Sequence, residues 1–175
     1  GRDSVFSAGF DLKVMKRGGF EAINMLRLGY SLPARILRYP YPVIIACNGH
    51  VLAMGVFTML SADYVIGSRG DFKISANEVA IGMTLPWFGI ELAQERVIEA
   101  HAHQVVTLAR IYDPEGAAEA GILDACCEPE NLLAEAASTA ERFAALDMPS
   151  FAATKARLRE GFAARWDAAI ARDFD

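Results

Sequence analysis

The stretch that decides the fold is residues 45–67, which read IACNGHVLAMGVFTMLSADYVIG. Its start completes an apolar, β-branched run at 43–47, and a second such run follows at 64–67. Short, uninterrupted apolar runs of this kind are typical of buried strands, often in a parallel sheet. Between them, an Asn-Gly dipeptide at 48–49 indicates a turn, and 54–62 predicts a helix. Strand, helix and strand without a repeat predict an α/β fold.

The pattern extends in both directions from this stretch. Apolar residues at helical spacing predict a helix over 20–37, with Pro33 as its kink or break. A third short strand is predicted at 72–74. From Pro86 onward, Ala-rich segments predict successive helices at 89–109, 114–120, 129–146 and 149–174, because prolines stand where helices prefer to begin. The chain therefore reads as an α/β half followed by a helical tail.

The composition fits one globular domain. The chain has 175 residues, of which 53% are hydrophobic and 22% charged, enough apolar material for a sizeable core. A net charge of -5 argues against non-specific binding to nucleic acid or to an anionic membrane, although a local basic patch for a phosphorylated ligand stays open. We expect neither nucleic acid nor membrane as a partner.

The cysteines and the first residues bear on the compartment. Cys126 and Cys127 are adjacent and Cys47 lies in an apolar run, which makes neither a disulfide framework nor a spaced zinc motif. No apolar stretch approaches the ~20 residues of a membrane helix, and residues 1–4 lack the layout of a signal peptide. We expect a soluble, cytoplasmic protein with reduced thiols. The sequence also begins without Met, which leaves processing or truncation open.

Four segments resemble the crotonase family, the enoyl-CoA hydratases and isomerases. SAGFDL at 7–12 is similar to the family's first oxyanion loop, and 45–67 is similar to its strand, Asn-Gly turn, small-residue loop, helix and strand. Residues 72–86, with Asn-Glu at 77–78, resemble the loop that carries the catalytic glutamate. AGILD at 120–124 is a weaker match to the segment before the terminal helices. Together the segments cover nearly all of the chain in the family's order.

The resemblance implies a fold and an assembly. It implies a ClpP/crotonase-like spiral α/β core at 1–125, followed by a C-terminal helical, trimerising region at 126–175. Such helices pack against neighbouring subunits, so a homotrimer or a hexamer is expected. Gly1 falls where the family has already completed its first two strands, so the core is expected to be N-terminally short. The implied substrate is a coenzyme A thioester, with no separate cofactor and no metal.

The implied chemistry is stabilisation of an enolate by two backbone donors. Removing a proton beside a thioester carbonyl makes an enolate oxygen that fixed N–H groups can hold, and each such donor is typically worth about 3 to 4 kcal/mol. By the resemblance, the donors are the N–H groups of Phe10 and Met54. Met54 departs from the glycine usual in the family, which bears on the width of the acyl pocket. Either loop alone is better read as a tight turn, because such turns are common. Both loops at the family's spacing favour a site.

The resemblance leaves a single catalytic carboxylate. Hydratases of the family carry a first glutamate three residues after the oxyanion position, and Phe57 stands there. The second family glutamate corresponds to Glu78. One carboxylate beside an oxyanion hole can move a proton between two carbons on one face of an allylic system. The pattern is similar to the mitochondrial-type Δ3,Δ2-enoyl-CoA isomerases, so an enoyl-CoA isomerase is favoured.

The remaining candidate residues divide into pocket and structural groups. By the resemblance, the acyl and CoA pocket includes Ala8, Gly9, Asp11, Leu12, Gly55, Phe57 and Trp87, although Trp87 is equally well read as core. Glu91 and Glu95 are expected on a solvated helix face. His50 is expected to be structural, and His101 and His103 form no zinc set. Two alternatives stay open: an enoyl-CoA hydratase of the same family, and a catalytically silent subunit that binds acyl-CoA.

Overall fold

The computed structural model describes residues 2–174 of the protein. Two terminal residues lie outside the described part of the chain: Gly1, the first residue of the expected core, and Asp175, the last residue of the expected helical region. The elements in chain order are β1 (Val5–Ser7), α1 (Leu12–Arg17), α2 (Gly19–Arg38), β2 (Ile44–Cys47), β3 (His50–Leu52), α3 (Met54–Leu60), β4 (Tyr64–Ser68), β5 (Ile74–Ser75), η1 (Val79–Ile81), α4 (Trp87–Arg96), α5 (Glu99–Val106), α6 (Pro114–Glu119), β6 (Ala125–Cys127), η2 (Pro129–Asn131), α7 (Leu132–Ala144), α8 (Met148–Leu158) and α9 (Glu160–Phe174).

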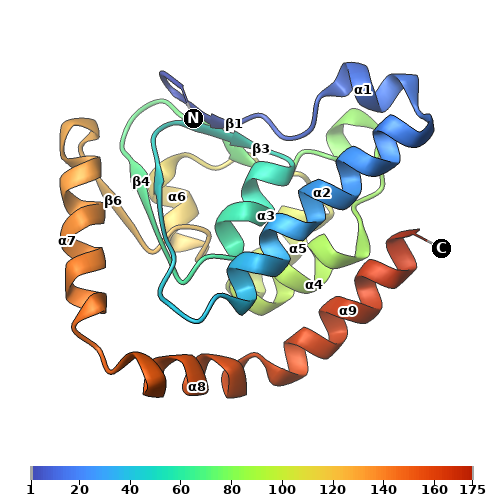
Figure 1. Ribbon diagram of the computed structural model, residues 1–175. Helices are drawn as coiled ribbons and strands as arrows, with labels where there is room; N and C mark the ends of the chain where they lie inside the picture. Colours follow the sequence, from blue (N-terminus) through green and yellow to red (C-terminus); the bar gives the residue numbers. More distant parts are fainter. Residues whose placement is uncertain (1, 175) are drawn as a thin grey trace.

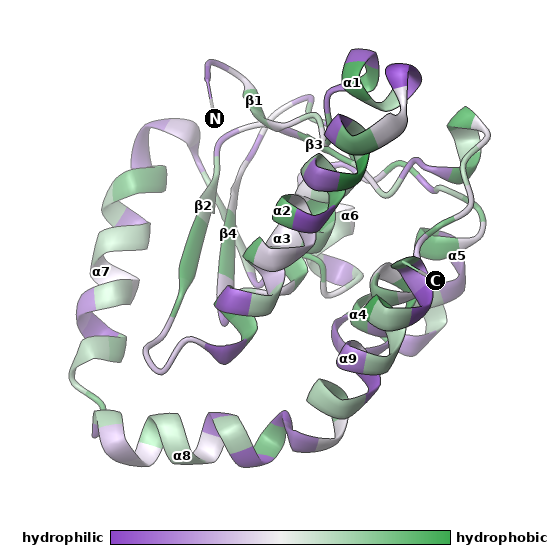
Figure 2. Ribbon diagram, turned by 45° about the vertical axis from the view of Figure 1, so that its right-hand side comes forward, coloured by the Kyte–Doolittle hydropathy of each residue, from purple (hydrophilic) through white to green (hydrophobic). Residues whose placement is uncertain are grey.

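The strands form two parallel sheets within the described residues. One sheet has the order β1-β3-β5 and the other the order β2-β4-β6. In the second sheet Ile44 lies opposite Tyr64 and Cys47 opposite Gly67. Figure 2 shows the hydrophobic colour on β2 and β4, the two apolar runs of the deciding stretch. The predicted parallel α/β arrangement is therefore present.

Helix α3 lies at the centre of the core. Residues Val56, Phe57, Met59 and Leu60 on this short helix are at most 1% exposed. Helix α7 packs on β2 and β4, and α9 runs beside α4, so the C-terminal helices pass around the outside of the α/β core (Figure 1). The helical tail is therefore in contact with the core at both of its ends.

Helix α2 does not break at Pro33. The helix runs from Gly19 to Arg38 with Pro33 inside it and buried. Proline removes one backbone donor and its ring crowds the carbonyl four residues earlier, which here belongs to Gly29. The packing of the buried helix face outweighs that local cost.

Two helices predicted as single are each divided in the structure. The segment 89–109 divides at Val97 and Ile98, which are extended, and the Ile98 N–H donates to the Ala120 carbonyl at 3.0 Å. Two consecutive β-branched residues favour extended backbone, and the tertiary hydrogen bond fixes it. The segment 149–174 divides at Arg159, between α8 and α9.

An ion cluster attaches this second division to the core. Arg159 and Lys155 contact opposite oxygens of Asp63, at 3.0 and 2.6 Å. The Arg159 guanidinium also donates to the Leu37 carbonyl at 2.8 Å. The carboxylate of Asp63 further accepts the Val43 N–H. A buried charge needs such partners, so the cluster holds the end of α8 to the strand β2 and to the end of α2.

Candidate active site

The first candidate loop follows β1. Gly9 has φ +83°, a conformation that L side chains rarely adopt, and its N–H donates to the Ser7 hydroxyl at 3.2 Å. A Cβ at Gly9 would lie 2.8 Å from the Ala53 Cβ and 3.4 Å from the Met54 nitrogen. Only glycine permits this approach, and it brings the Phe10 loop into contact with the Met54 loop.

The second candidate loop joins β3 to α3. Ala53 has φ 51° and ψ -126°, a strained conformation for a residue with a Cβ, and its N–H donates to the Ser75 carbonyl at 3.0 Å. Met54 is the first residue of α3, and its side chain is buried in the core. The strain falls on Ala53, so the helical position after it accepts a side chain in place of glycine.

The two predicted donor groups are free of protein acceptors. Within residues 2–174, neither the Phe10 N–H nor the Met54 N–H donates a hydrogen bond to another protein group. Met54 opens a helix, so its N–H has no intrahelical partner. Both loops therefore present a backbone donor beside the same contact at Gly9.

Glu78 is buried in the loop between β5 and η1. Its side chain belongs to a residue only 7% exposed, and the Oε2 atom has no hydrogen-bond partner among the described residues. The loop is closed by the Met83 N–H, which donates to the Glu78 carbonyl at 2.9 Å, and by Gly82 in the left-handed conformation. Burial raises the pKa of the Glu78 carboxyl above its ordinary value, and its own backbone N–H partly opposes the rise.

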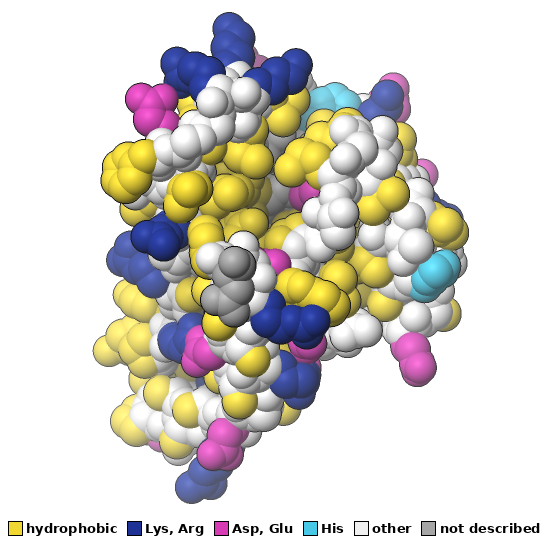
Figure 3. All heavy atoms as spheres, turned by 90° about the vertical axis from the view of Figure 1, so that its right-hand side faces the viewer, with side chains coloured by type: hydrophobic (Ala, Val, Ile, Leu, Met, Phe, Trp, Pro, Cys, Tyr) yellow, Lys and Arg dark blue, Asp and Glu magenta, His cyan; other side chains and the backbone are white. Residues whose placement is uncertain are grey.

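Glu78 and both loops meet at one cavity of about 250 Å³, here called the Glu78 cavity. Its lining is mostly apolar and consists of Ala8, Phe10, Leu12, Met15, Leu52, Ala53, Asn77, Glu78, Ile81 and Met83. Among these residues Glu78 is the one ionisable side chain. Figure 3 shows a hollow lined by hydrophobic side chains, with Lys and Arg gathered at the top of the same face. Phe10 is in this lining, whereas Met54 is outside it, next to the lining residue Ala53. A buried carboxylate and an apolar wall suit proton transfer on an apolar substrate.

The predicted pocket residues of the first loop take different positions. Ala8 and Leu12 line the Glu78 cavity. Asp11 instead begins α1, where its carboxylate accepts the N–H groups of Lys13 and Val14. Its role in the structure is therefore that of a helix cap.

Gly55, Phe57 and Trp87 lie outside the lining of the cavity. A Cβ on Gly55 would be 2.7 Å from the Ser7 Cβ, so this glycine permits α3 to pack on β1. Phe57 is 0% exposed, and its ring packs at 5.5 Å from that of Phe88 in the core. Trp87 is 43% exposed at the start of α4, beneath the guanidinium of Arg172.

The cavity also contains residues that the sequence analysis did not assign to it. These are Met15, Leu52, Asn77, Ile81 and Met83. Asn77 was visible as the neighbour of Glu78, and its Oδ1 is likewise buried without a hydrogen-bond partner among the described residues. Met15 was not foreseen because α1 is short and its pattern too brief to indicate a helix.

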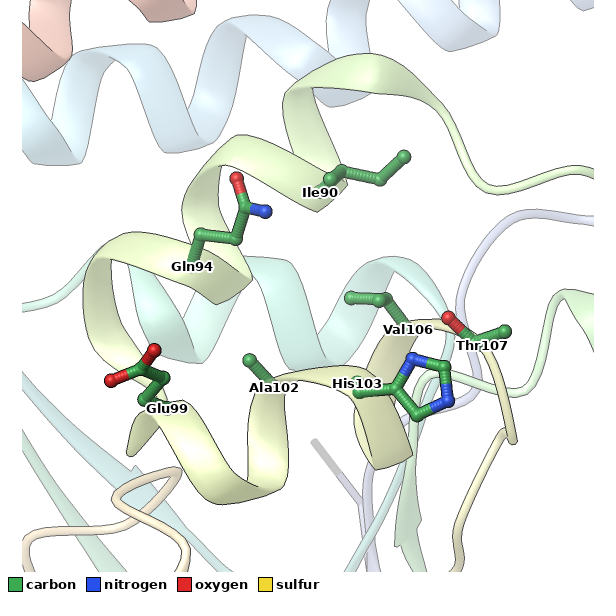
Figure 4. Close-up of a pocket in the computed structure, with 7 residues that line it drawn as sticks. All are labelled: Ile90, Gln94, Glu99, Ala102, His103, Val106 and Thr107. Carbon is green, nitrogen blue, oxygen red and sulfur yellow. The ribbon is translucent and has the colours of Figure 1, made fainter.

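A larger groove of about 700 Å³ lies between α4 and α5, away from these residues (Figure 4). It is lined by Ile90, Gln94, Glu99, Ala102, His103, Val106 and Thr107.

The described part of the chain contains no group of three His, Cys, Asp or Glu side chains placed to hold a metal ion. No helix within residues 2–174 is both long and apolar enough to cross a membrane.

The glutamates expected on a solvated face are ion-paired. Arg165 on α9 contacts Glu91 at 3.0 Å and Glu95 at 2.8 Å, both on α4. The two glutamates thus link α4 to α9, which a pattern within one helix could not reveal. His50 accepts the Lys73 N–H at 2.9 Å, in keeping with a structural role.

Comparison with known proteins gives a consistent assignment. The family model described as enoyl-CoA hydratase/isomerase matches residues 1–174. A probable enoyl-CoA hydratase of Mycobacterium tuberculosis is 27% identical over 158 residues, 90% of this chain, and the chain spans only 59% of that protein's length.

Solved structures give the same picture. An enoyl-CoA hydratase/isomerase family protein from Pseudomonas syringae matches with a TM-score of 0.95 and 42% identity, covering 98% of this chain and 75% of that one. The human mitochondrial delta3-delta2-enoyl-CoA isomerase matches with a TM-score of 0.91 and 25% identity, covering 98% and 67%. These scores confirm the expected α/β core followed by helices.

Proposed function

We propose, from the premise that this chain belongs to the enoyl-CoA hydratase/isomerase family, that it moves the double bond of an enoyl-CoA. The observation that carries the proposal is the isolation of Glu78. It is buried, its Oε2 has no partner among the described residues, and it is the one ionisable group in the lining of the Glu78 cavity. A single carboxylate suffices for proton transfer between two carbons and offers no second acid or base for water.

The proposed reaction is a proton shuttle. The Glu78 carboxylate takes a proton from C2 of a 3-enoyl-CoA, and the C2–H electron pair passes into a dienolate. The Phe10 and Met54 N–H groups donate to the enolate oxygen, which carries the developing charge. The protonated Glu78 then returns its proton to C4, and the double bond lies between C2 and C3. The product is a 2-enoyl-CoA, and no other reactant is consumed.

Charge near the cavity suits a CoA thioester. Helix α1 contributes Leu12 and Met15 to the cavity, and the same helix carries Lys13, Lys16 and Arg17. Cations within a short distance of the mouth attract a phosphorylated carrier, although the protein as a whole is acidic. The acyl end then meets the apolar wall.

The test replaces the carboxylate with its amide. Glu78→Gln should lose about 10²-fold to 10⁴-fold in isomerisation rate, the usual contribution of a positioned acid or base, while CoA binding is retained. Conjugation of 3-enoyl-CoA and hydration of 2-enoyl-CoA are followed separately for both proteins, and CoA binding is measured by calorimetry. Glu91→Gln, on α4 outside the Glu78 cavity where it pairs with Arg165, is the matched control and should keep wild-type rates. A wild type that hydrates as fast as it isomerises would overturn the single-base proposal.

Hydration is the second candidate, favoured by Asn77. The relative from Mycobacterium tuberculosis is named a hydratase. Asn77 lines the Glu78 cavity with a buried Oδ1 that has no partner among the described residues. An amide oxygen there can accept a hydrogen bond from water. Under this reading Asn77→Ala should abolish hydration, whereas under the isomerase reading the Asn77→Ala protein still isomerises.

A further inference from the structure

The Phe10 ring rests directly on the backbone of α2. A Cβ built on Gly29 would lie 2.2 Å from the Phe10 Cε1 and 2.3 Å from its Cζ, whereas Cδ1 would be at an ordinary 3.5 Å. Real Cβ contacts essentially never fall below 3.0 Å. The ring tip therefore occupies the space that any side chain at position 29 would fill.

Gly29 is not required by its own backbone. It lies inside α2, with no positive φ, in a helix interior where glycine is less favourable than alanine. The close approach of the ring is the one feature at this position that demands glycine. The missing side chain at position 29 leaves a gap on α2, here called the Gly29 notch, in which the Phe10 ring packs.

An aromatic neighbour on the same helix also packs beside the Phe10 ring. The Phe10 ring centroid is 6.1 Å from that of Tyr30, which in turn is 4.2 Å from that of Phe88 on α4. Tyr30 is 9% exposed, and burial above all raises its pKa to about 12, so the phenol remains neutral and the stack stays apolar. Gly29 and Tyr30 together fix where the ring can lie.

Both ends of the Phe10 residue are thus constrained. On one side Gly9 is pressed against Ala53 and Met54, and on the other the ring is seated on α2. The Phe10 N–H lies between these two contacts. Its direction is consequently set by α2, an element that contributes no residue to the lining of the Glu78 cavity.

We propose that Gly29 is a positioning residue of the reaction: its notch in α2 seats the Phe10 ring and so aims the Phe10 N–H at the enolate oxygen. This inference rests on the proposed enolate chemistry. Misplacing a donor by about 1 Å can cost about 10²-fold in rate. Such a change reduces kcat much more than it raises KM, because the enolate oxygen forms only during the reaction.

The test is a double-mutant cycle between positions 29 and 10. Gly29→Ala adds the clashing Cβ, and Phe10→Leu removes the Cε1 and Cζ atoms that it would meet. Gly29→Ala alone should lower kcat about 10-fold to 10²-fold with little change in KM. In the Phe10→Leu background, Gly29→Ala should change kcat less than about 2-fold, which is the coupling expected of residues in contact. Gly161→Ala on α9, where a Cβ would meet only the Arg165 Nη1 at an ordinary 3.8 Å, is the matched control and should leave kcat unchanged.

The outcomes separate this inference from the proposed function. The cycle is measured on whichever enoyl-CoA reaction the wild type catalyses, so a wild type that only hydrates removes the isomerase proposal and not this one. Equal kcat losses from Gly29→Ala in the wild-type and in the Phe10→Leu backgrounds would overturn the positioning role. So would equal changes in KM and kcat. If Gly29→Ala does not fold, the comparison is made in the Phe10→Leu background, where a lost fold or a large kcat loss also overturns it.

Discussion

At the scale of single residues, the burial of Glu78 predicts the pH dependence of the proposed reaction. The carboxylate must be ionised to accept the C2 proton, and burial raises its pKa above the ordinary value. We expect kcat/KM to fall as the pH drops through that raised pKa, so that its acid limb lies above the pKa of an exposed glutamate. A pH–rate profile checks this. An acid limb at or below the ordinary glutamate pKa would contradict a buried base.

The same burial predicts that Glu78 lowers stability at neutral pH. Because the folded-state pKa is raised, the native protein holds this proton at pH values where the unfolded chain has lost it. Stability therefore falls as the pH rises from the ordinary pKa to the raised one. Glu78→Gln should raise Tm above this window and leave it unchanged at lower pH. Calorimetry of both proteins across pH checks the sign, and a lower Tm for the variant at neutral pH would refute it.

The structure changes the effect expected of a glutamate at position 57. A glutamate at position 57 matches the hydratase pattern, but the side chain is 0% exposed and lies against Phe88 rather than in the Glu78 cavity. Phe57→Glu should thus destabilise the protein by more than about 4 kcal/mol, because it buries an unpaired charge, and should bring no hydration. Urea unfolding with Phe57→Leu as control measures this. A stable Phe57→Glu protein that hydrates would place position 57 in the site.

Two candidate site residues, Gly9 and Glu78, could be proposed from the sequence because each lies in a short local motif. The seating of Phe10 on Gly29 could not, because the two residues are 19 positions apart and meet only through packing. Phe57 could not be assigned to core or cavity for the same reason: an apolar side chain suits both.

At the scale of elements, α9 supplies the cap of α4. The Asp173 carboxylate accepts the N–H of Trp87 at 2.7 Å and that of Phe88 at 3.1 Å. These are the first residues of α4, whose N-cap, Pro86, offers no side-chain acceptor. The C-terminal helix thereby performs for α4 what an N-cap residue usually does.

Removing that cap should destabilise α4. Asp173→Ala is expected to cost about 0.5–2 kcal/mol, by analogy with loss of an N-cap. In a chain of this size, each 1 kcal/mol lowers Tm by about 2–4 °C. Thermal unfolding measures the change. The control is Asp167→Ala, also on α9, which removes an exposed ion pair with Arg38 of α2. Equal shifts for the two variants would show that the cap contributes no more than a surface ion pair.

Element boundaries could be predicted where neighbouring residues such as proline mark them, and could not where a contact with a distant part of the chain sets them. The strand at β2 and the start of α6 at Pro114 follow from apolar runs and proline. The end of α4 at Arg96 depends on a hydrogen bond from Ile98 to a residue more than twenty positions away. Strand β6 was missed because three residues carry too little pattern to indicate a strand.

At the scale of the whole molecule, the C-terminal helices predict an assembly. Leu133, Leu146 and Leu158 on or beside α7 and α8 are 76%, 50% and 76% exposed. Large apolar side chains left exposed along these two helices favour contact with further copies of the chain. We expect a trimer or a hexamer by light scattering at micromolar concentration. Leu158→Asp should shift the mass toward the monomer without loss of helical circular dichroism, and a monomeric wild type would contradict the prediction.

The cap from Asp173 also sets an order of events during synthesis. Trp87 emerges 86 residues before its acceptor. At ~5–20 residues per second, the ribosome needs about 4 to 17 s to cover that distance. Throughout this interval the first N–H groups of α4, next to the segment that carries Glu78, have no carboxylate to meet them. A nascent chain stalled before position 173 should therefore hold all six described strands, while α4 still lacks its cap.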